Sequence, residues 1–168
     1  MNNALPTDYQ NFIATSRYAR WIDDQQRRET WSETVTRYVD FLSSKASIDY
    51  DTTEKIWDAI YGLEVMPSMR ALMTAGAALA RDNTAGYNCA YLPVDDMKSF
   101  DEAMYILLCG TGVGFSVERD NVNKLPEIPA RVQKGEDMLV VHDSKEGWAK
   151  ALRKLIALLY AGVIPSWD

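Results

Sequence analysis

The stretch 87–118 limits the fold of this chain more than any other part of the sequence. Cys89 opens a short apolar run that is typical of a strand and ends at residue 93. A segment with helical periodicity follows, and a glycine-rich turn then leads into a second strand-like run over 113–118. The sequence therefore predicts a strand, a helix and a strand in this order.

The helix within this unit is predicted from its spacing and its ends. Its apolar side chains recur at helical intervals, at Phe100, Met104, Leu107 and Leu108. Ser99 is followed three residues later by Glu102, which is the pattern of a capping box at a helix start. Gly110 can end the helix in a left-handed conformation, whereas Gly112 and Gly114 let another group approach the backbone closely, in a tight turn or beside a ligand.

Length and composition describe a chain that can bury a core. With 168 residues, of which 47% are hydrophobic, it is expected to form one domain, or one domain with an appendage. No apolar run approaches the roughly 20 residues of a membrane span, and the N-terminus lacks the basic and apolar regions of a signal peptide. The formal net charge of −6 disfavours binding to nucleic-acid phosphates. We therefore expect a cytoplasmic protein with no membrane or nucleic-acid partner.

The residues that could bind a metal are few. The chain has two cysteines, Cys89 and Cys109, and one histidine, His142, which are too few for a disulfide scaffold or a metal cluster. On composition alone, each thiol is expected to be a small buried apolar group. A structural hydrogen bond is the favoured role of His142, and we expect no metal site.

The first part of the chain is predicted to be helical. We expect a short helix over 8–14 and an amphipathic helix over 31–44, the latter begun by a capping box of Thr30 and Glu33. Another helix is expected to begin at Asp51 with Glu54 in its first turn, and to end before Pro67, which restrains the residue ahead of it.

After the central stretch, charged and proline-rich residues over 121–135 predict a loop, followed by a short strand over 138–141. Ser144 begins a final helix that Gly162 ends, and residues 163–168 resemble the start of another extended element. Two or three strands cannot close a sheet of their own, so we expect exposed edges and a partner segment outside this chain.

Several separate motifs, in one order over nearly the whole chain, resemble the catalytic chain of ribonucleotide reductases. They are YARW at 18–21, WSETVTR at 31–37, YGLEVMPSMR at 61–70, NC at 88–89, LCGTGVGFSVER at 108–119 and DSKEGW at 143–148. The similarity is greatest to the adenosylcobalamin-dependent class, in its ribonucleoside-triphosphate reductase branch.

The resemblance implies a mixed α+β or α/β fold. A helical N-terminal region, 1–66, would precede the first strands and helices of a ribonucleotide-reductase-type α/β barrel, 67–168, which is truncated at its C-terminal end. The family's finger loop with its Asn-x-Cys-x-Glu pattern and radical cysteine is absent. We therefore expect the chain alone to be inactive and to need a missing C-terminal portion, which would also bind most of the adenosylcobalamin cofactor.

The resemblance also assigns chemistry to one cysteine. Members of the family replace the ribose 2'-hydroxyl with hydrogen, and a pair of thiols supplies the electrons and becomes a disulfide that a thioredoxin-type dithiol reduces again. Cys89 falls where the first of these two thiols lies, whereas Cys109 matches no catalytic position and is expected to be a packing residue.

Further site residues follow from the same resemblance. Ser68, Asn88 and Gly112, together with Cys89, are expected to contact the ribonucleotide substrate. The resemblance favours ribonucleoside triphosphates over diphosphates as this substrate. Asp95 or Asp96 falls near the specificity site for a deoxynucleotide effector, although either could instead serve only as a favourable charge at a helix start. The best-known monomeric members carry an insertion between the second strand and the final helix, which this chain lacks. The oligomeric state and the effector site therefore stay open.

Two alternatives also stay open. One keeps the chemistry but takes the radical from a metal-containing partner protein, as class I ribonucleotide reductases do. The other is a non-catalytic chain, a fragment kept for interaction or regulation, or a vestige. Activity of the chain combined with its missing portion, with and without adenosylcobalamin, distinguishes the three.

Overall fold

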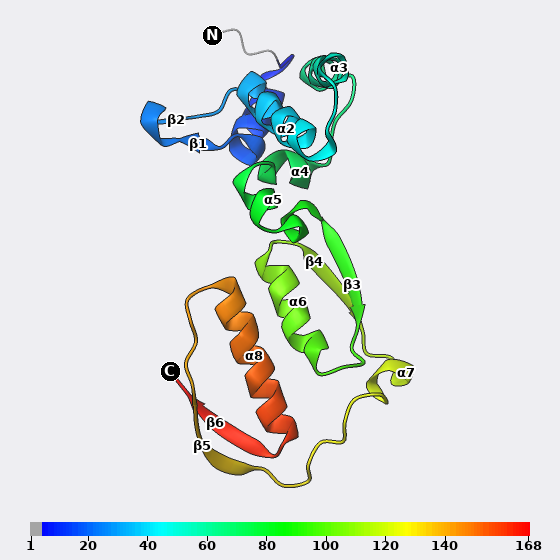
Figure 1. Cartoon of the computed structure of the whole chain (residues 1–168), viewed down its shortest axis with the longest axis vertical. Coiled ribbons are helices and arrows are strands. Elements are labelled where there is room, and N and C mark those ends of the chain that lie inside the picture. Colours follow the sequence, from blue (N-terminus) through cyan, green and yellow to red (C-terminus); the bar gives the residue numbers. More distant parts are fainter. Residues whose placement is uncertain (1–4) are drawn as a thin grey trace. The chain divides into compact units, whose positions relative to one another are not determined.

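The computed structural model describes residues 5–168, and its fold divides into two compact units. The first unit ends at Tyr87 and the second runs from Asn88 to Asp168 (Figure 1). The domain boundary predicted from the sequence, between residues 66 and 67, stays a prediction. None of the helices described is long and apolar enough to span a lipid bilayer.

The first unit is mainly helical. Its elements, in chain order, are α1 (Asp8–Ile13), the π-helical turn η1 (Ala14–Tyr18), β1 (Trp21–Ile22), the 3-10 turn η2 (Asp23–Gln25), β2 (Arg27–Arg28), α2 (Trp31–Ala46), α3 (Tyr50–Tyr61), α4 (Met69–Thr74), α5 (Ala77–Arg81) and the 3-10 turn η3 (Asn83–Gly86). Strands β1 and β2 form a short antiparallel pair. The helical character predicted for this region is confirmed, and the expected helices near 8–14 and 31–44 are α1 and α2.

Helix α2 forms where its capping residues and its apolar stripe predict it. The Thr30 hydroxyl accepts from the amide of Glu33, and the Glu33 carboxylate accepts from the amide of Thr30, so the predicted capping box is present. The buried face of α2 joins a core of buried apolar side chains, whose members are Leu5, Ala14, Trp31, Val35, Val39, Ile60 and Leu72. This core holds α2 against η1, α3 and α4.

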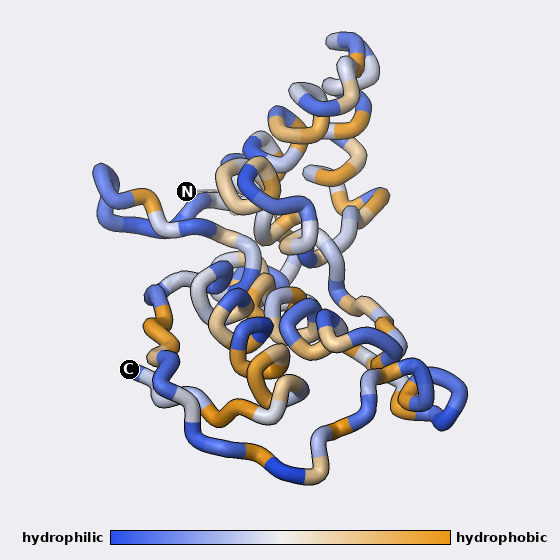
Figure 2. The backbone as a smooth tube through the Cα atoms, turned by 60° about the horizontal axis from the view of Figure 1, so that its bottom comes forward, coloured by the Kyte–Doolittle hydropathy of each residue, from blue (hydrophilic) through white to orange (hydrophobic). Residues whose placement is uncertain are grey.

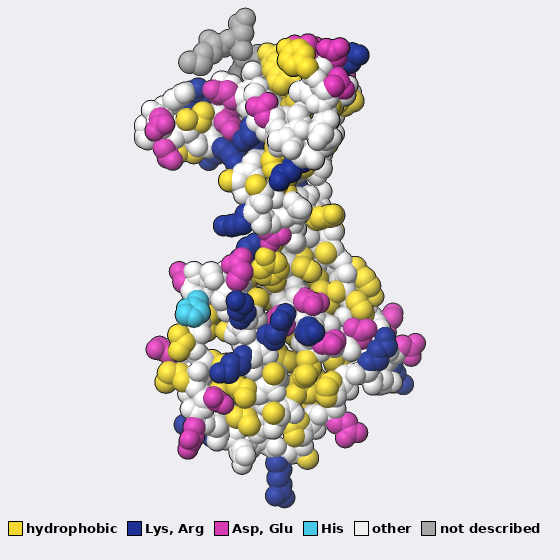
Figure 3. Space-filling model, viewed as in Figure 1, with side chains coloured by type: hydrophobic (Ala, Val, Ile, Leu, Met, Phe, Trp, Pro, Cys, Tyr) yellow, Lys and Arg dark blue, Asp and Glu magenta, His cyan; other side chains and the backbone are white. Residues whose placement is uncertain are grey.

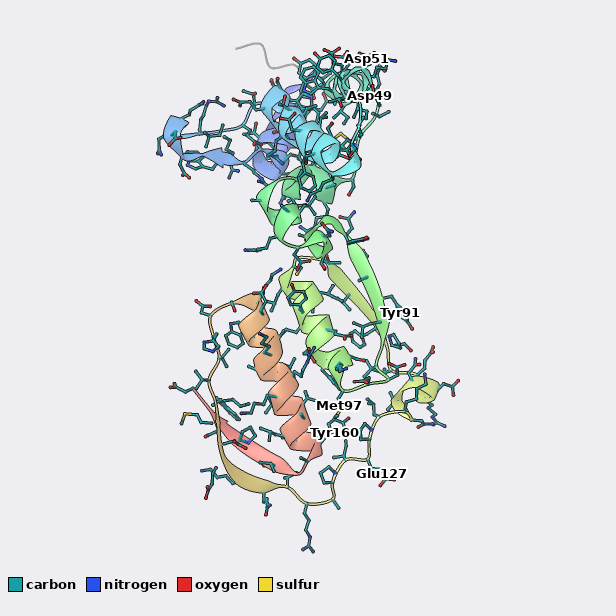
Figure 4. All side chains as sticks on the ribbon, viewed as in Figure 1. Asp49, Asp51, Tyr91, Met97, Glu127 and Tyr160 are labelled. Atoms are coloured by element: carbon teal, nitrogen blue, oxygen red, sulfur yellow. The ribbon has the colours of Figure 1, made fainter. Side chains whose placement is uncertain are left out.

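Helix α3 begins earlier than the sequence pattern predicted. Asp49, not Asp51, is its N-cap, because the Asp49 carboxylate accepts from the amide of Thr52 at 2.9 Å. Asp51 lies inside the first turn, where its negative charge is still favourable (Figure 4). The helix ends at Tyr61, ahead of Pro67 as expected.

A buried arginine links the elements of the first unit. The Arg37 guanidinium binds the Glu29 carboxylate with Nε and Nη2 and donates from Nη1 to the carbonyls of Leu72 and Ala75, at 3.0 and 3.1 Å. Burial raises the pKa of Glu29, but hydrogen bonds led by that from Arg37 outweigh this effect, so the net pKa is lowered. Arg37 therefore neutralises a buried carboxylate and satisfies carbonyls at the end of α4.

The second unit, as described, combines two long helices and one short helix with four strands. Its elements are β3 (Cys89–Pro93), α6 (Lys98–Leu108), β4 (Gly112–Ser116), α7 (Arg119–Val122), β5 (Gln133–Leu139), α8 (Lys145–Tyr160) and β6 (Val163–Trp167). Strands β3 and β4 pair in parallel, as do β5 and β6, and within the described residues the two pairs remain separate sheets. Helices α6 and α8 pack side by side (Figure 1). The predicted mixed fold is confirmed, and the strands described do not close a barrel.

Helix α6 corrects the predicted capping box. Ser99 lies inside the helix, which begins at Lys98, and its hydroxyl donates to the carbonyl of Pro93 at 3.0 Å instead of capping a helix end. The carboxylate of Asp96 accepts from the amide of Lys98 at 2.8 Å and takes over that role. Met97 is the N-cap residue but makes no side-chain cap bond (Figure 4). Gly110 has φ +86° and ends the helix region as predicted.

The remaining elements follow the prediction in part. The Ser144 hydroxyl accepts from the amide of Gly147, so α8 begins where expected, and β6 is the predicted extended element. The loop predicted over 121–135 is shorter, because α7 occupies its start and β5 begins at Gln133. Hydropathy varies along α6 and α8, each of which has hydrophilic and hydrophobic positions (Figure 2).

The apolar side chains of α6 are not all buried. Leu107 and Leu108, two of the apolar residues whose spacing predicts this helix, are 55% and 47% exposed. The buried residues of α6 are polar, namely Ser99 and Asp101, and Asp101 is paired with Arg153 of α8 at 2.6 Å. Hydrophobic side chains are accordingly spread over the visible face of this unit (Figure 3). This exposure agrees with a unit that packs against further protein.

Candidate active site

Cys89 lies at the beginning of β3 with an exposed side chain. In the parallel pairing of β3 and β4 it is directly opposite Gly112. The amide of Gly112 donates to the carbonyl of Asn88 at 2.9 Å, which fixes the glycine turn beside the cysteine. The structure therefore brings three predicted site residues together, Asn88, Cys89 and Gly112.

The sheet face around Cys89 is open because glycines line it. Side chains alternate between the two faces of a strand, so Cys89 and Tyr91 share one face, and their partners across the pair are Gly112 and Gly114. A Cβ on Gly112 would come no closer than 3.5 Å to another atom, and one on Gly114 no closer than 3.8 Å. Among the described residues a Cβ at either position would meet only ordinary contacts, so the two glycines leave the face around the thiol free of side chains.

Ser68, the other predicted substrate residue, belongs to the first unit. It is the N-cap of α4, and its hydroxyl accepts from the amide of Ala71 at 3.5 Å. Its place at the start of a helix is a local, structural role that the motif did not indicate. A contact of Ser68 with substrate stays a prediction.

The two candidate effector residues have different partners. The Asp95 carboxylate accepts from Lys124 at 3.3 Å, whereas Asp96 caps the first turn of α6. Asp96 thus has the structural role at a helix start that the sequence offers as the alternative to effector binding. Asp95 is held by an exposed ion pair, which a ligand can replace at small cost. An effector role of either residue stays a prediction.

Cys109 occupies a different environment from Cys89. It is the C-cap of α6, is half-buried, and its Sγ accepts from Lys145 Nζ at 3.1 Å. The same ammonium group lies 4.8 Å from the centre of the Tyr105 ring. Sequence spacing does not predict this contact, because Lys145 lies 36 positions after Cys109. Cys109 is therefore tied to α8 by a polar contact, which simple apolar packing did not predict.

The described residues contain no group of three or more histidine, cysteine or acidic side chains that could bind a metal ion. His142 has an exposed side chain, and only its carbonyl is engaged, as the acceptor for the amide of Ser144 at 2.8 Å. An apolar groove of about 490 Å³ lies along α8, lined by residues such as Met104, Trp148 and Trp167, and Cys89 is not part of it. Chemistry at Cys89 would thus take place on an open sheet face.

Comparison with known proteins shows which family the chain resembles. The sequence profile described as the ribonucleotide reductase alpha domain matches residues 2–77. The adenosylcobalamin-dependent ribonucleoside-triphosphate reductase of Lactobacillus gasseri is 30% identical over 171 residues, covering 82% of this chain and 22% of the relative. The enzyme of the same name from Lacticaseibacillus paracasei is 28% identical over 215 residues, covering 89% of this chain and 29% of the relative.

A solved structure shows the same fold. The crystal structure of a B-12 dependent (class II) ribonucleotide reductase matches with a TM-score of 0.79 and 21% identity, covering 94% of this chain and 32% of that chain. Residues 2–77 therefore resemble the alpha domain of ribonucleotide reductases, and the chain has the fold of part of a solved member of that family. Within that family it is similar to a part of the adenosylcobalamin-dependent, class II ribonucleoside-triphosphate reductases, and it spans 22–29% of the length of the two relatives named above.

Proposed function

We propose that this chain is the N-terminal part of an adenosylcobalamin-dependent ribonucleotide reductase that makes 2'-deoxyribonucleotides for DNA synthesis. Ribonucleoside triphosphates are the favoured substrates. The observation that supports this best is the placement of Cys89. An exposed thiol begins a strand, opposite a glycine turn, in a chain whose relatives are named for this reaction. A rigid strand is a suitable mount for a reacting thiol because it holds the sulfur more closely in position than a loop does.

In this proposal Cys89 is one of two reducing thiols. The ribose C2'–O bond breaks, a C2'–H bond forms and the oxygen leaves as water. The two protons and two electrons come from Cys89 and a second cysteine outside this sequence, which together become a disulfide. A thioredoxin-type dithiol then reduces the disulfide by thiol exchange, so that a new cycle can begin.

Adenosylcobalamin supplies the radical that starts the reaction when it is bound. The cofactor would be held mainly by the remainder of the reductase. What this chain contributes is the Cys89 thiol and the backbone around it.

The substrate and effector assignments extend this proposal. Asn88 and Gly112 border Cys89 and would contact the ribose and its phosphate side. Ser68 is kept as a substrate residue on the motif resemblance alone. Asp95 is the better candidate for a deoxynucleotide effector, because Asp96 is engaged at the start of α6. The expected partners are therefore the substrate, the effector, the dithiol and the rest of the reductase, in the cytoplasm.

The test uses a reconstituted enzyme, defined as this chain combined with a polypeptide that supplies the remaining length of a class II reductase. We expect deoxynucleotide formation from ribonucleoside triphosphates only when adenosylcobalamin and a dithiol are both present. Activity that needs a metal-radical partner protein instead of adenosylcobalamin would favour the class I alternative. Failure under every condition, with both polypeptides folded, would favour a non-catalytic chain.

A further inference from the structure

Tyr91 shares the sheet face of Cys89. The two residues are separated by one position in β3, so both side chains point to the same side, about 6.6 Å apart along the strand. Tyr91 is 68% exposed, and its ring extends from β3 on the side away from α6 (Figure 4). An aromatic side chain that is this exposed, next to a candidate reactive thiol, is suited to contact a group outside the residues described.

The position opposite Tyr91 leaves its ring accessible. Gly114 is its partner across the β3–β4 pair, and a Cβ there would meet nothing closer than 3.8 Å. An aromatic ring can compensate for a glycine by lying over its backbone, but a ring used in this way would be largely covered. The high exposure of Tyr91 shows that its ring surface is available to another group.

The chemistry of this face indicates what that group would be. The side chains and glycines of this face, taken from the strand register, are uncharged: Cys89, Tyr91, Pro93, Gly112, Gly114 and Ser116. An uncharged face with an aromatic ring suits the ribose and base of a nucleotide, because every base has a flat surface that stacks on aromatic side chains. The side chains of this face include no cation for a phosphate, so the face suits the ribose and the base better than the phosphates.

We propose that Tyr91 is a substrate-contacting residue whose ring forms a wall beside Cys89 and holds the ribose or base of the ribonucleotide while the thiol reacts. This inference rests on the proposed function of Cys89 and adds a residue to that site. The ring, not the hydroxyl, makes the contact, and Gly114 keeps the space in front of it open.

The test compares substitutions of Tyr91 in the reconstituted enzyme. Substrate affinity is measured by equilibrium binding of a ribonucleoside triphosphate in a Cys89→Ser background, where no turnover interferes. Tyr91→Ala should weaken binding about tenfold, in the range that loss of base–aromatic stacking produces. Tyr91→Phe should bind like the parent, and Gly114→Val should weaken binding by filling the space before the ring. Tyr50→Ala is the matched control, since Tyr50 is 72% exposed on α3, and it should leave binding unchanged.

Turnover measurements separate this inference from the proposed function. With Cys89 intact, Tyr91→Ala should raise KM about tenfold with a smaller change in kcat. An unchanged KM in an active enzyme would overturn the role of Tyr91 alone. Equal losses of melting temperature and affinity in both Tyr91→Ala and Tyr91→Leu would assign the ring to packing and also overturn it. If the unsubstituted reconstituted enzyme makes no deoxynucleotide, the proposed function fails instead.

Discussion

Cys89 and Gly112 lie directly opposite each other across the parallel β3–β4 pair, and the amide of Gly112 is bonded to the carbonyl that precedes the cysteine. The glycine turn therefore has two effects on the thiol. It fixes the backbone at the start of β3, and it places no side chain beside the sulfur. The accessibility of Cys89 depends on a residue that lies more than twenty positions further along the chain.

Gly112→Ala should test the second effect without disturbing the fold. A Cβ at this position would lie 3.5 Å from its nearest neighbour, the Asn88 carbonyl oxygen, which is an ordinary contact distance. The free energy of unfolding should therefore change by less than about 1 kcal/mol. In the reconstituted enzyme the added methyl group should reduce turnover, because it narrows the approach to Cys89. The matched control is Gly147→Ala, whose Cβ would lie 2.2 Å from the carbonyl oxygen of His142 and should destabilise the chain by about 2 kcal/mol. Melting curves and turnover of both variants provide the comparison, and full activity in Gly112→Ala would argue against a role for the open face.

Arg37→Ala should strongly destabilise the first unit. The substitution leaves the Glu29 carboxylate, whose side chain is only 10% exposed, without its cation and removes donors from the carbonyls of Leu72 and Ala75. Removing one partner of a buried ion pair costs about 3 kcal/mol or more. Arg27→Ala, which removes a more exposed ion pair with Glu33, should have a much smaller effect. Urea unfolding followed by circular dichroism measures both, and similar midpoints for the two variants would contradict the assigned importance of Arg37.

Glu33 should make the first unit sensitive to acid. Hydrogen bonds from the Arg27 guanidinium, and then from the amide of Thr30, lower the pKa of Glu33 from 4.5 to about 2. A carboxyl group whose pKa is depressed by folding stabilises the folded state above its unfolded pKa, and this contribution is lost as the pH falls through the folded pKa. The loss attributable to Glu33 should therefore occur between pH 4.5 and about 2. The difference in stability between the parent and Glu33→Gln, measured by urea unfolding across this window, should shrink as the pH falls, and a constant difference would count against the assignment.

The isolated chain should self-associate or have low solubility. Strands β3 and β4 form a parallel pair with free edges in the described structure, and apolar side chains such as Tyr91, Leu107 and Phe115 are exposed. Exposed edges and apolar surface favour association at protein concentrations on the order of tens of micromolar. Sedimentation velocity measures this directly. A sharp monomeric boundary, together with slow amide exchange in β3 and β4, would show that the unit is complete by itself.

Local patterns predicted those parts of the structure that depend on neighbouring residues. The capping box of Thr30 and Glu33, the Ser144 cap and the bounds of β3 are confirmed because each is decided within a few positions of the chain. The cap of α3 was assigned to the wrong aspartate because Asp49 and Asp51 both precede a helical pattern at suitable spacing.

Contacts between distant residues explain what the sequence did not predict. The Ser99 hydroxyl donates to the carbonyl of Pro93 and does not cap the helix. The Cys109 sulfur accepts a hydrogen bond from Lys145. Neither partner can be inferred from spacing. The alternation of side chains along β3, in contrast, did offer a signal for Tyr91, since it stands two positions after Cys89. The role of Cys89 came from the motif resemblance, and the structure adds the open face on which it lies.

The central claim is that Cys89 performs the redox chemistry and Cys109 does not. The exposed thiol of Cys89 faces an open sheet surface, whereas Cys109 is half-buried at the end of α6 beside Lys145. Cys89→Ser should preserve the fold and substrate binding but abolish multiple turnover, since a hydroxyl group cannot form the disulfide that a dithiol reduces. Cys109→Ala should retain turnover and cost stability, by about 1 kcal/mol.

The measurement that tests this claim most directly is dithiol-dependent multiple turnover of the two variants in the reconstituted enzyme, with melting temperatures recorded in parallel. The proposal predicts no multiple turnover in Cys89→Ser at an unchanged melting temperature, and near-normal turnover in Cys109→Ala. Near-normal turnover in Cys89→Ser, or loss of turnover confined to Cys109→Ala with its stability unchanged, would contradict it.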